Sequence, residues 1–385
     1  MKKIILFVHQ SADLYGSDKV LLALVTGLDQ EKFQPIVLLP FTGPLLDKFI
    51  EAGIECHVIP ITRLSRATLS LKGVLGLPGH LIKSTVAINH VLQGRQVDIV
   101  HSNTLAVLSG AIWSRFYRIP HIWHVHEIIL RPAMVRKIYA FLLSFFADTI
   151  ICISNATKSN LLLDNPALND KIRVVWNGLI RDHVLNSESV RHTRNAYGVK
   201  DDEVLLVLVG RINRWKGQHL LVNAVEILWH KGIRNLKILF VGSVVPGQEN
   251  FLTDLEAAID KSHAKQCFII QSFTEDIWTI WDACDIGVIP STEPEPFGMV
   301  ALEAMASSKA VIAANHGGLA EIVLTDETGL LVTPNDPIEL ASAINRLAGD
   351  AAIRQNMGRA AYNRYASDFT LTKYVKNITQ IYDEL

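Results

Sequence analysis

The chain has 385 residues, of which 49% are hydrophobic and 19% charged, a composition typical of an ordered globular protein rather than a disordered or fibrous one. Its length exceeds what one hydrophobic core usually organises, so two domains are expected. The net charge of −1 conceals an asymmetry, because residues 1–185 carry about +6 (19 Lys and Arg, 13 Asp and Glu) and the remainder about −7 (18 against 25). Neither half is dominated by basic residues, so we expect no nucleic-acid partner. A positive first half would suit an anionic surface, although ordinary variation between domains explains the split equally well.

The cysteines and the apolar segments indicate the compartment. The four cysteines are far apart and form no CxxC pair, which favours a reducing environment. The apolar run Ile4–Val8 is too short for a signal peptide, and Ile138–Phe146 is too short to span a bilayer. We therefore expect a cytoplasmic protein, soluble or peripheral at the inner face of a membrane.

Short apolar runs alternate with helical patterns along the whole chain. Because the runs are continuous rather than alternating, they predict strands covered on both faces, hence parallel sheets with helices between them. The first set comprises Ile4–Val8, Ile36–Leu39, His57–Ile59, Ile99–Val100, His121–Trp123, Thr149–Ile153 and Arg173–Val175. After a polar stretch at 186–194 the second set comprises Val204–Val209, Lys237–Val241, Phe268–Gln271, Ile286–Ile289, Ala310–Ala313 and Gly329–Val332. Two doubly wound α/β domains follow, with ligands expected beyond the carboxyl ends of their strands.

The last predicted helix, Leu371–Leu385, has apolar residues at helical spacing. It could cap the second domain or cross back onto the first.

The strongest candidate site is the segment Pro290–Ala306. A buried strand ends at Pro290, and Gly298 opens an apolar helix, so Glu295 lies in the loop and Glu303 about one turn inside the helix. Free amides and the dipole at a helix start attract anions, while a carboxylate there could bind sugar hydroxyls or favour positive charge on an anomeric carbon. The alternative is that Glu295 is a helix-start charge and Glu303 a solvated residue.

A second motif follows the strand Val204–Val209. Arg211 offers a forked donor and Lys216 a point charge around one turn, a combination suited to a diphosphate. Alone, this spacing would be an ordinary surface pattern, but its place between a strand and a helix strengthens it.

His124-Val125-His126-Glu127 follows a predicted strand in the first domain. Paired histidines with a glutamate could bind a metal, but no other Cys or His cluster completes the set, so we expect no metal site. No predicted strand is followed by GxGxxG, which argues against a nicotinamide dehydrogenase.

Together these residues resemble the retaining glycosyltransferases of the GT-B fold, family four, also called the glycosyl transferases group 1. Glu295 and Glu303 match the E-x7-E element of that family, and Arg211 with Lys216 makes the match specific. The chain departs from the family at Tyr15-Gly16-Ser17-Asp18, where Gly-Gly-Ala-Glu is common, and at Trp176, where Tyr is more familiar. Supporting matches are Gly317-Gly318-Leu319-Ala320-Glu321-Ile322, Thr328–Val332, Ser154-Asn155 and Trp176-Asn177-Gly178.

The resemblance implies an architecture. Two Rossmann-like domains would face a cleft: an acceptor domain at 1–185 and a nucleotide-sugar donor domain at 186–367. The C-terminal helix, 368–385, would cross back to the first domain.

The resemblance also implies roles for the candidate residues. Arg211 and Lys216 would neutralise the leaving diphosphate in place of a divalent metal, so no cofactor is expected beyond the donor substrate. Glu295 would contact the sugar and Glu303 the ribose hydroxyls, while His126 would hydrogen-bond a sugar hydroxyl. The remaining donor contacts would be the backbone at Gly16 and the amides of Phe297, Gly298 and Met299, and the loop Gln271–Glu275 is the candidate for the base.

We therefore expect a retaining, metal-independent transfer from a nucleoside diphosphate sugar to an acceptor hydroxyl, in cell-surface polysaccharide or glycoconjugate synthesis. The alternatives are another GT-B activity, such as a sugar-nucleotide epimerase or phosphorylase, and a non-catalytic partner subunit. The acceptor would be a glycan or lipid-linked, because Arg131, Arg136 and Lys137 stand beside an apolar helix suited to an anionic membrane. Otherwise, Phe141–Phe146 is core and the charges are solvated.

Overall fold

The computed structural model describes residues 2–64, 68, 71–181, 184 and 186–385. The chain forms two compact units: unit 1 comprises Met1–Gly178 and Leu371–Leu385, and unit 2 comprises Leu179–Thr370. The expected boundary after residue 185 falls on a position outside the described residues. The observed division lies a few residues earlier, and the return to unit 1 begins at Leu371 rather than at 368.

Unit 1 contains a seven-stranded parallel sheet with the order β3-β2-β1-β4-β5-β6-β7. Each predicted strand of the first half is present, with ends shifted by one or a few residues. The strands are β1 (Lys3–His9), β2 (Phe33–Leu39), β3 (Glu55–Val58), β4 (Ile99–Asn103), β5 (His121–Val125), β6 (Thr149–Cys152) and β7 (Ile172–Val174).

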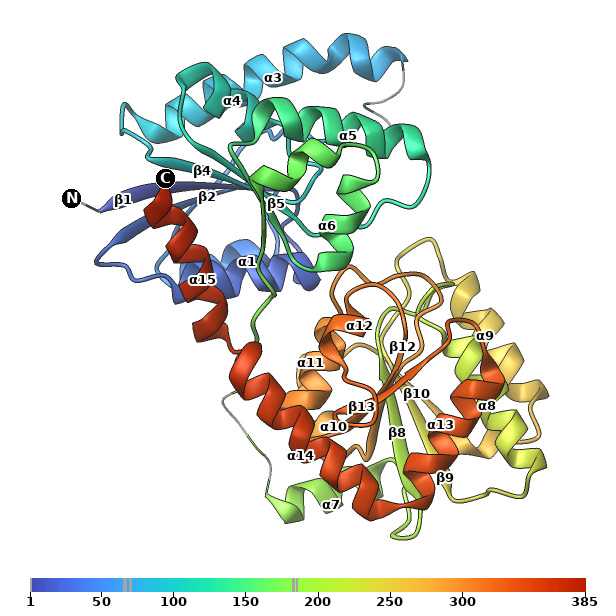
Figure 1. The fold of residues 1–385 in the computed structure, drawn as a ribbon. Helices are drawn as coiled ribbons and strands as arrows, with labels where there is room; N and C mark the ends of the chain where they lie inside the picture. The colour runs from blue at the N-terminus through green and yellow to red at the C-terminus, as the bar shows by residue number, and fades with distance from the viewer. Residues whose placement is uncertain (1, 65–67, 69–70, 182–183, 185) are drawn as a thin grey trace. The chain divides into compact units, whose positions relative to one another are not determined.

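Helices cover both faces of this sheet, which explains why its strands are apolar on both sides. Figure 1 shows α3, α4 and α5 on one face and α1 and α15 on the other. The described helices of unit 1 are α1 (Gly16–Gly27), α2 (Pro44–Glu51), α3 (Leu71–Leu92), α4 (Ser109–Tyr117), α5 (Ala133–Phe146), α6 (Asn155–Leu162) and α15 (Leu371–Glu384).

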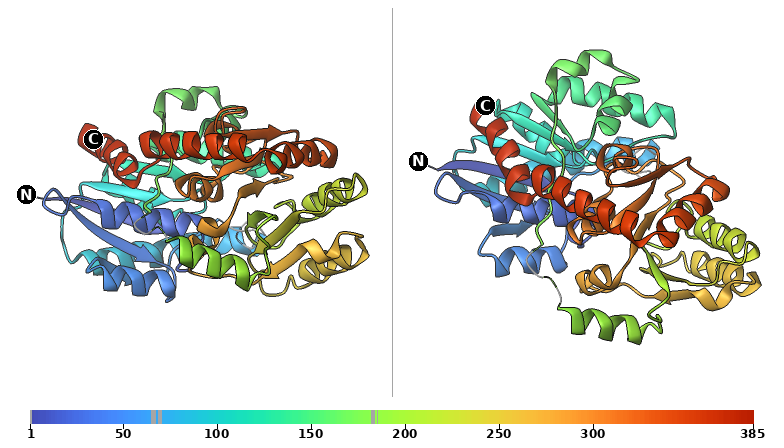
Figure 2. Two further views of the ribbon diagram at one scale, coloured as in Figure 1. Left: turned by 90° about the horizontal axis from the view of Figure 1, so that it is seen from below. Right: turned by 60° about the horizontal axis from the view of Figure 1, so that its bottom comes forward.

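The C-terminal helix α15 belongs to unit 1 and lies beside α1 in Figure 1 and in the right view of Figure 2. Its buried face is the predicted apolar stripe from Tyr374 to Tyr382. A Cβ added to Gly27 of α1 would come within 2.9 Å of Val375, so glycine lets the two helices approach closely. The sequence left two places open for this helix, and the structure selects the one on the first domain.

Unit 2 contains a six-stranded parallel sheet with the order β10-β9-β8-β11-β12-β13. All predicted strands of the second half are again present: β8 (Val204–Val209), β9 (Leu236–Val241), β10 (Phe268–Gln271), β11 (Ile286–Ile289), β12 (Ala310–Ala314) and β13 (Gly329–Val332). The described helices are α7 (Ser187–Ala196), α8 (Gln218–His230), α9 (Asn250–Lys261), α10 (Ile277–Ala283), α11 (Met299–Ala306), α12 (Leu319–Ile322), α13 (Pro337–Gly349) and α14 (Ala351–Asp368).

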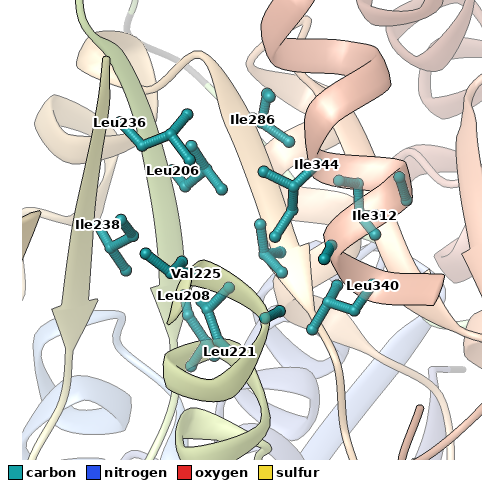
Figure 3. Close-up of a cluster of buried hydrophobic side chains, with 14 of the residues drawn as sticks. Leu206, Leu208, Leu221, Val225, Leu236, Ile238, Ile286, Ile312, Leu340 and Ile344 are labelled. Atoms are coloured by element: carbon teal, nitrogen blue, oxygen red, sulfur yellow. The ribbon is translucent and has the colours of Figure 1, made fainter. Parts of the chain in front are cut away.

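One large cluster of buried hydrophobic side chains in unit 2 fills one side of this sheet. Figure 3 shows Leu206 and Leu208 of β8 packed with Leu221 and Val225 of α8, and Ile344 of α13 approaching from the other edge. These side chains are almost fully buried, and such burial is worth about 1.5–3 kcal/mol for each large aliphatic side chain. The strands that carry these side chains therefore form a rigid base for the loops that follow their carboxyl ends.

In both sheets the strand order reverses next to the first strand. In unit 1 the reversal lies between β1 and β4, and in unit 2 between β8 and β11. Open α/β sheets bind ligands outside the carboxyl ends of the strands at such a reversal. The candidate residues must therefore be sought in the loops after these four strands.

Candidate functional site

The loops after β8 and β11 meet at the reversal point of unit 2. Lys216 Nζ donates to Glu295 Oε1 over 2.5 Å, and both side chains are largely buried. The loop backbones are joined as well, because Thr292 N–H donates to the carbonyl of Trp215 at 2.7 Å. The structure thus brings together two residues that lie in separate sequence motifs.

The carboxylate of Glu295 has a second donor, the hydroxyl of Ser291, 2.7 Å from the same Oε1. Ser291 is held in turn by His316, whose Nε2–H donates to its carbonyl oxygen at 2.9 Å. Burial raises the pKa of Glu295, but the ammonium of Lys216 and the two hydrogen bonds outweigh it, so the pKa lies below the ordinary value. Glu295 is therefore a fixed, ionised group rather than a loose helix-start charge.

The turn that carries Lys216 is shaped by two residues that sequence reasoning did not single out. The side-chain oxygen of Asn213 accepts the backbone N–H groups of Trp215 and Lys216, which folds the loop back on itself. Gly217 follows with φ +81°, and a Cβ there would lie 2.1 Å from the carbonyl oxygen of Pro290. Only glycine lets the two loops approach this closely.

The Gly317-Gly318 pair packs against the loop that carries Glu295. Gly318 N–H donates to the carbonyl of Glu295 at 2.8 Å. A Cβ at Gly318 would lie 2.4 Å from Phe297 Cα, and one at Gly317 would lie 2.3 Å from Glu295 O. This segment, known from the sequence only as a resemblance, therefore positions the backbone that carries Glu295.

Helix α11 begins directly after this loop. Phe297 is buried, Gly298 adopts φ +117° as the residue before the helix, and Met299 is its first residue. The first amides of a helix have no acceptor within the helix, so this end favours an anion. Inside the helix, Glu303 is half-buried and accepts the indole N–H of Trp281 at 3.0 Å, so the alternative that it is merely solvated is wrong.

Arg211 is half-buried and directly follows Gly210 at the end of β8. Its backbone carbonyl accepts the side-chain amide of Gln218 at 3.0 Å. Gly210 in turn lies against Gly242 at the end of β9, where a Cβ would come within 2.1 Å of Gly210 O. The base of the loop is therefore tied to the neighbouring strand.

His126 and Gly16 belong to unit 1. His126 stands just beyond β5 and is buried, with Nε2 2.9 Å from the side-chain oxygen of Asn103. Gly16 is the exposed first residue of α1, and a Cβ there would meet none of the described atoms within 4 Å. Asp18 points inward, where it accepts Tyr15 N–H at 2.8 Å and pairs with His9 at 2.7 Å.

Among the described residues, one group of His, Cys, Asp or Glu side chains brings its ligand atoms within 4.8 Å of one another, and it is not His124–Glu127. It comprises Glu226, His230 and His263, with His263 Nδ1 hydrogen-bonded to Glu226 Oε1 at 2.6 Å and His230 Nε2 3.0 Å from the same oxygen. Its carboxylate also accepts the Ser262 hydroxyl and the His263 amide, so hydrogen bonds account for the cluster.

Family models match both parts of the chain. The family model described as "Glycosyl transferases group 1" matches residues 189–364, and the model "Glycosyltransferase Family 4" matches residues 15–182. A D-inositol 3-phosphate glycosyltransferase of Corynebacterium diphtheriae is 31% identical over 304 residues, covering 74% of this chain and 70% of that protein. An uncharacterised glycosyltransferase of Methanocaldococcus jannaschii is 27% identical, covering 75% and 76%.

Solved structures show the same fold. The Anabaena protein HepE, crystallised with UDP, is 25% identical and covers all of both chains with a TM-score of 0.84. The lipopolysaccharide glycosyltransferase WaaG is 15% identical, covers 98% of this chain and 99% of its own, and has a TM-score of 0.69. The two units thus have the GT-B fold, and the chain belongs to the group 1 glycosyltransferases.

Proposed function

We propose that the protein transfers a glycosyl unit from a nucleoside diphosphate sugar to an acceptor hydroxyl, with retention of the anomeric configuration. The observation that carries the proposal is the Lys216–Glu295 pair, placed at the strand-order reversal of unit 2 just before helix α11. Support for the donor class comes from HepE, which has been crystallised with UDP and with UDP-glucose.

The leaving diphosphate needs positive charge as the glycosidic bond breaks. Lys216 and Arg211 supply it from fixed positions, and the amides of Phe297, Gly298 and Met299 add donors at the start of α11. Preorganised donors of this kind stabilise developing charge without reorganisation, which lets the site act without a divalent metal. Glu303 accepts from the ribose, Glu295 contacts the sugar, and His126 hydrogen-bonds a sugar hydroxyl.

Two measurements test this function. Thermal unfolding with a panel of nucleoside diphosphates and their sugars identifies the donor, because a ligand that binds only the folded state raises the melting temperature. Release of nucleoside diphosphate on addition of acceptor then separates a transferase from a non-catalytic subunit, which would bind without turnover. The anomeric proton coupling in the NMR spectrum of the product distinguishes retention from inversion.

A second feature favours an acceptor at a membrane, as in the assembly of surface polysaccharides. Helices α3, α4 and α5 cover one face of the first sheet, and their sequences contain no Asp or Glu. Phe141 and Phe145 are 66% and 56% exposed, so the interpretation of these two residues as core is wrong. Among the side chains that the structure describes, the other large exposed apolar residues of these helices are Leu75, Ile82 and Val86 of α3, Phe116 and Tyr117 of α4, and Met134 of α5.

These exposed side chains are accompanied by positive charge. Arg115 lies over the ring of Phe145, and Lys137 shares one helical stripe of α5 with Met134 and Phe141. Arg136 is paired with Asp164 instead and contributes less than the sequence suggested. An apolar face with basic residues fits the interface of an anionic bilayer, at about 1 kcal/mol for each Lys or Arg near the surface. Within the described part of the chain, no helix is long and apolar enough to cross a membrane.

Liposome flotation tests the membrane contact. We expect binding to anionic vesicles that weakens with salt, with Lys137→Glu, and with Phe141→Ser. The matched control is Phe273→Ser, which removes an aromatic side chain of similar exposure from unit 2 and should leave binding unchanged. Equal lack of binding to anionic and neutral vesicles would rule the membrane surface out.

A further inference from the structure

Four polar side chains form a continuous hydrogen-bonded chain inside unit 1. Asp18 Oδ1 lies 2.7 Å from His9 Nε2, and His9 Nδ1 lies 3.0 Å from the side-chain nitrogen of Asn103. The side-chain oxygen of Asn103 is 2.9 Å from His126 Nε2. Asp18, His9 and Asn103 are almost fully buried, and His126 is 9% exposed.

The sheet register brings these groups together. His9 and Asn103 are directly paired at the carboxyl ends of β1 and β4, where the strand order reverses, and Asn103 is paired with His124 of β5. His126 follows two residues later and, because side chains alternate along a strand, starts on the same face as His124. A buried polar group without a partner is costly, so such a chain persists only when its members satisfy one another.

The protons along the chain can be assigned from the carboxylate outward. Burial raises the pKa of Asp18, but the hydrogen bonds from His9 and from the Tyr15 amide bring it below the ordinary value, so Asp18 is ionised near neutral pH. Because a carboxylate only accepts, His9 Nε2 must carry a proton. The side-chain nitrogen of Asn103 can only donate and lies 3.0 Å from His9 Nδ1, nearer than the Asn103 backbone carbonyl at 3.4 Å, so Nδ1 accepts from the amide. This orientation turns the Asn103 side-chain oxygen toward His126.

The proton on His126 is placed in the same way. The Asn103 oxygen accepts, so His126 Nε2 carries the proton. Burial, with a smaller contribution from His124, holds the pKa of His126 well below its ordinary value, so the ring is neutral and Nδ1 has a lone pair. The histidine can therefore accept a hydrogen bond through Nδ1 but cannot donate one there.

We propose that Asp18, His9 and Asn103 are positioning residues that hold His126 as the neutral Nε2–H tautomer and make it a hydrogen-bond acceptor for a hydroxyl of the donor sugar. The identity of the ligand rests on the proposed function, whereas the tautomer does not. If His9 instead carried two protons, the Asn103 amide would be reversed and His126 would donate through Nδ1–H. The orientation of the Asn103 amide therefore decides whether His126 accepts a hydrogen bond from a sugar hydroxyl or donates one to it.

The tautomer can be measured directly on the ligand-free protein with 15N-labelled histidine. Long-range 1H–15N correlation spectra distinguish the two neutral tautomers and the imidazolium, and His126→Gln identifies the His126 signals by their disappearance. We expect the Nε2–H pattern at neutral pH. An Nδ1–H pattern or an imidazolium would overturn the proposal, and neither result depends on activity.

Variants at Asn103 test whether this residue sets the tautomer of His126. Asn103→Leu removes the acceptor, so His126 should lose its single tautomer, while Asn103→Asp keeps an acceptor oxygen and should retain it. The matched control is Glu55→Gln, which breaks the partly exposed His57–Glu55 pair at 2.9 Å and should leave the His126 signals unchanged. An unchanged His126 spectrum in a folded Asn103→Leu protein would contradict the coupling.

Kinetics separate positioning from a structural role. In the active enzyme, Asn103→Leu should raise the KM for the donor about tenfold or more, since one oriented hydrogen bond is lost, while Asn103→Asp should recover most of it. If the wild-type protein transfers no sugar, the proposed function fails and the NMR result still stands. A normal donor KM in Asn103→Leu would refute the role of His126 as an oriented acceptor.

Discussion

Lys216 Nζ and Glu295 Oε1 are 2.5 Å apart, so the cation that we propose for the diphosphate is paired with a carboxylate before any donor binds. The pair removes the cost of a lone charge in a largely buried loop. It also means that an incoming diphosphate either shares Lys216 with Glu295 or displaces the carboxylate toward the sugar. The two residues are therefore expected to respond to the donor together.

The first prediction concerns this pair. Lys216→Ala should reduce turnover by roughly a hundredfold or more, the scale for removing one preorganised donor to developing charge. Steady-state release of nucleoside diphosphate measures it. The matched control is Arg214→Ala, which breaks the exposed Arg214–Glu293 ion pair between the same two loops, joined over 2.8 Å. Turnover of Lys216→Ala within about threefold of wild type would refute the assignment.

A second prediction is that chelators leave turnover intact. We propose that Arg211 and Lys216 neutralise the leaving diphosphate in place of a divalent cation. Dialysis against EDTA should therefore change kcat by less than about twofold. Loss of activity that Mg²⁺ or Mn²⁺ restores would show that a metal is required. The Glu226–His230–His263 cluster lies at the other end of α8 from Lys216, so a melting-temperature change alone would not bear on catalysis.

The third prediction tests the support beneath the Glu295 loop. Gly318 has φ −68°, a conformation open to alanine, so Gly318→Ala isolates the clash with the Phe297 backbone. We expect a loss of about 1–3 kcal/mol in the free energy of unfolding, as for overpacking, together with a higher KM for the donor. Gly349→Ala is the control, because a Cβ there meets none of the described atoms within 4 Å. Equal unfolding midpoints for the two variants would contradict the tight contact.

The fourth prediction is a pH dependence of stability. Burial raises the pKa of Glu226, but hydrogen bonds from Ser262 and His263 and the charges of His263 and His230 lower it to about 2. A depressed carboxyl pKa stabilises the fold above the ordinary value near 4.5, and the contribution disappears as the pH falls toward 2. The melting-temperature difference between wild type and Glu226→Gln should therefore be larger at pH 5.5 than at pH 3. A constant difference across that range would argue against the assignment.

The fold could be predicted from the sequence because both sheets are buried on both faces. Continuous runs such as Val204–Val209 leave little ambiguity between a buried strand and a surface element when polar loops and helical patterns bracket them. The ends were less certain. Ile99–Val100 extends to Asn103 in the structure because the polar residues His101, Ser102 and Asn103 continue the ladder.

The site was only partly predictable for a related reason. Charged residues at strand ends, such as Lys216 and Glu295, stand out from apolar surroundings. The hydroxyl of Ser291 donates to Glu295, and His316 donates to the backbone carbonyl of Ser291. These contacts form only after folding, so no spacing in the sequence identifies the two residues. Asn103 was likewise invisible, because its partners His9 and His126 reach it through sheet register.

The position of α15 has a consequence for the order in which the protein can form during synthesis. Unit 2 is one continuous segment, whereas unit 1 receives its last helix only after all of Leu179–Thr370 has been made. Until then, Gly27 has no contact with the side chain of Val375, and His101 has no hydrogen bond with the hydroxyl of Tyr382, which is 2.7 Å away in the complete protein. On the ribosome, the segment made first therefore completes its folding last, and during that interval the side of α1 that α15 later covers is exposed.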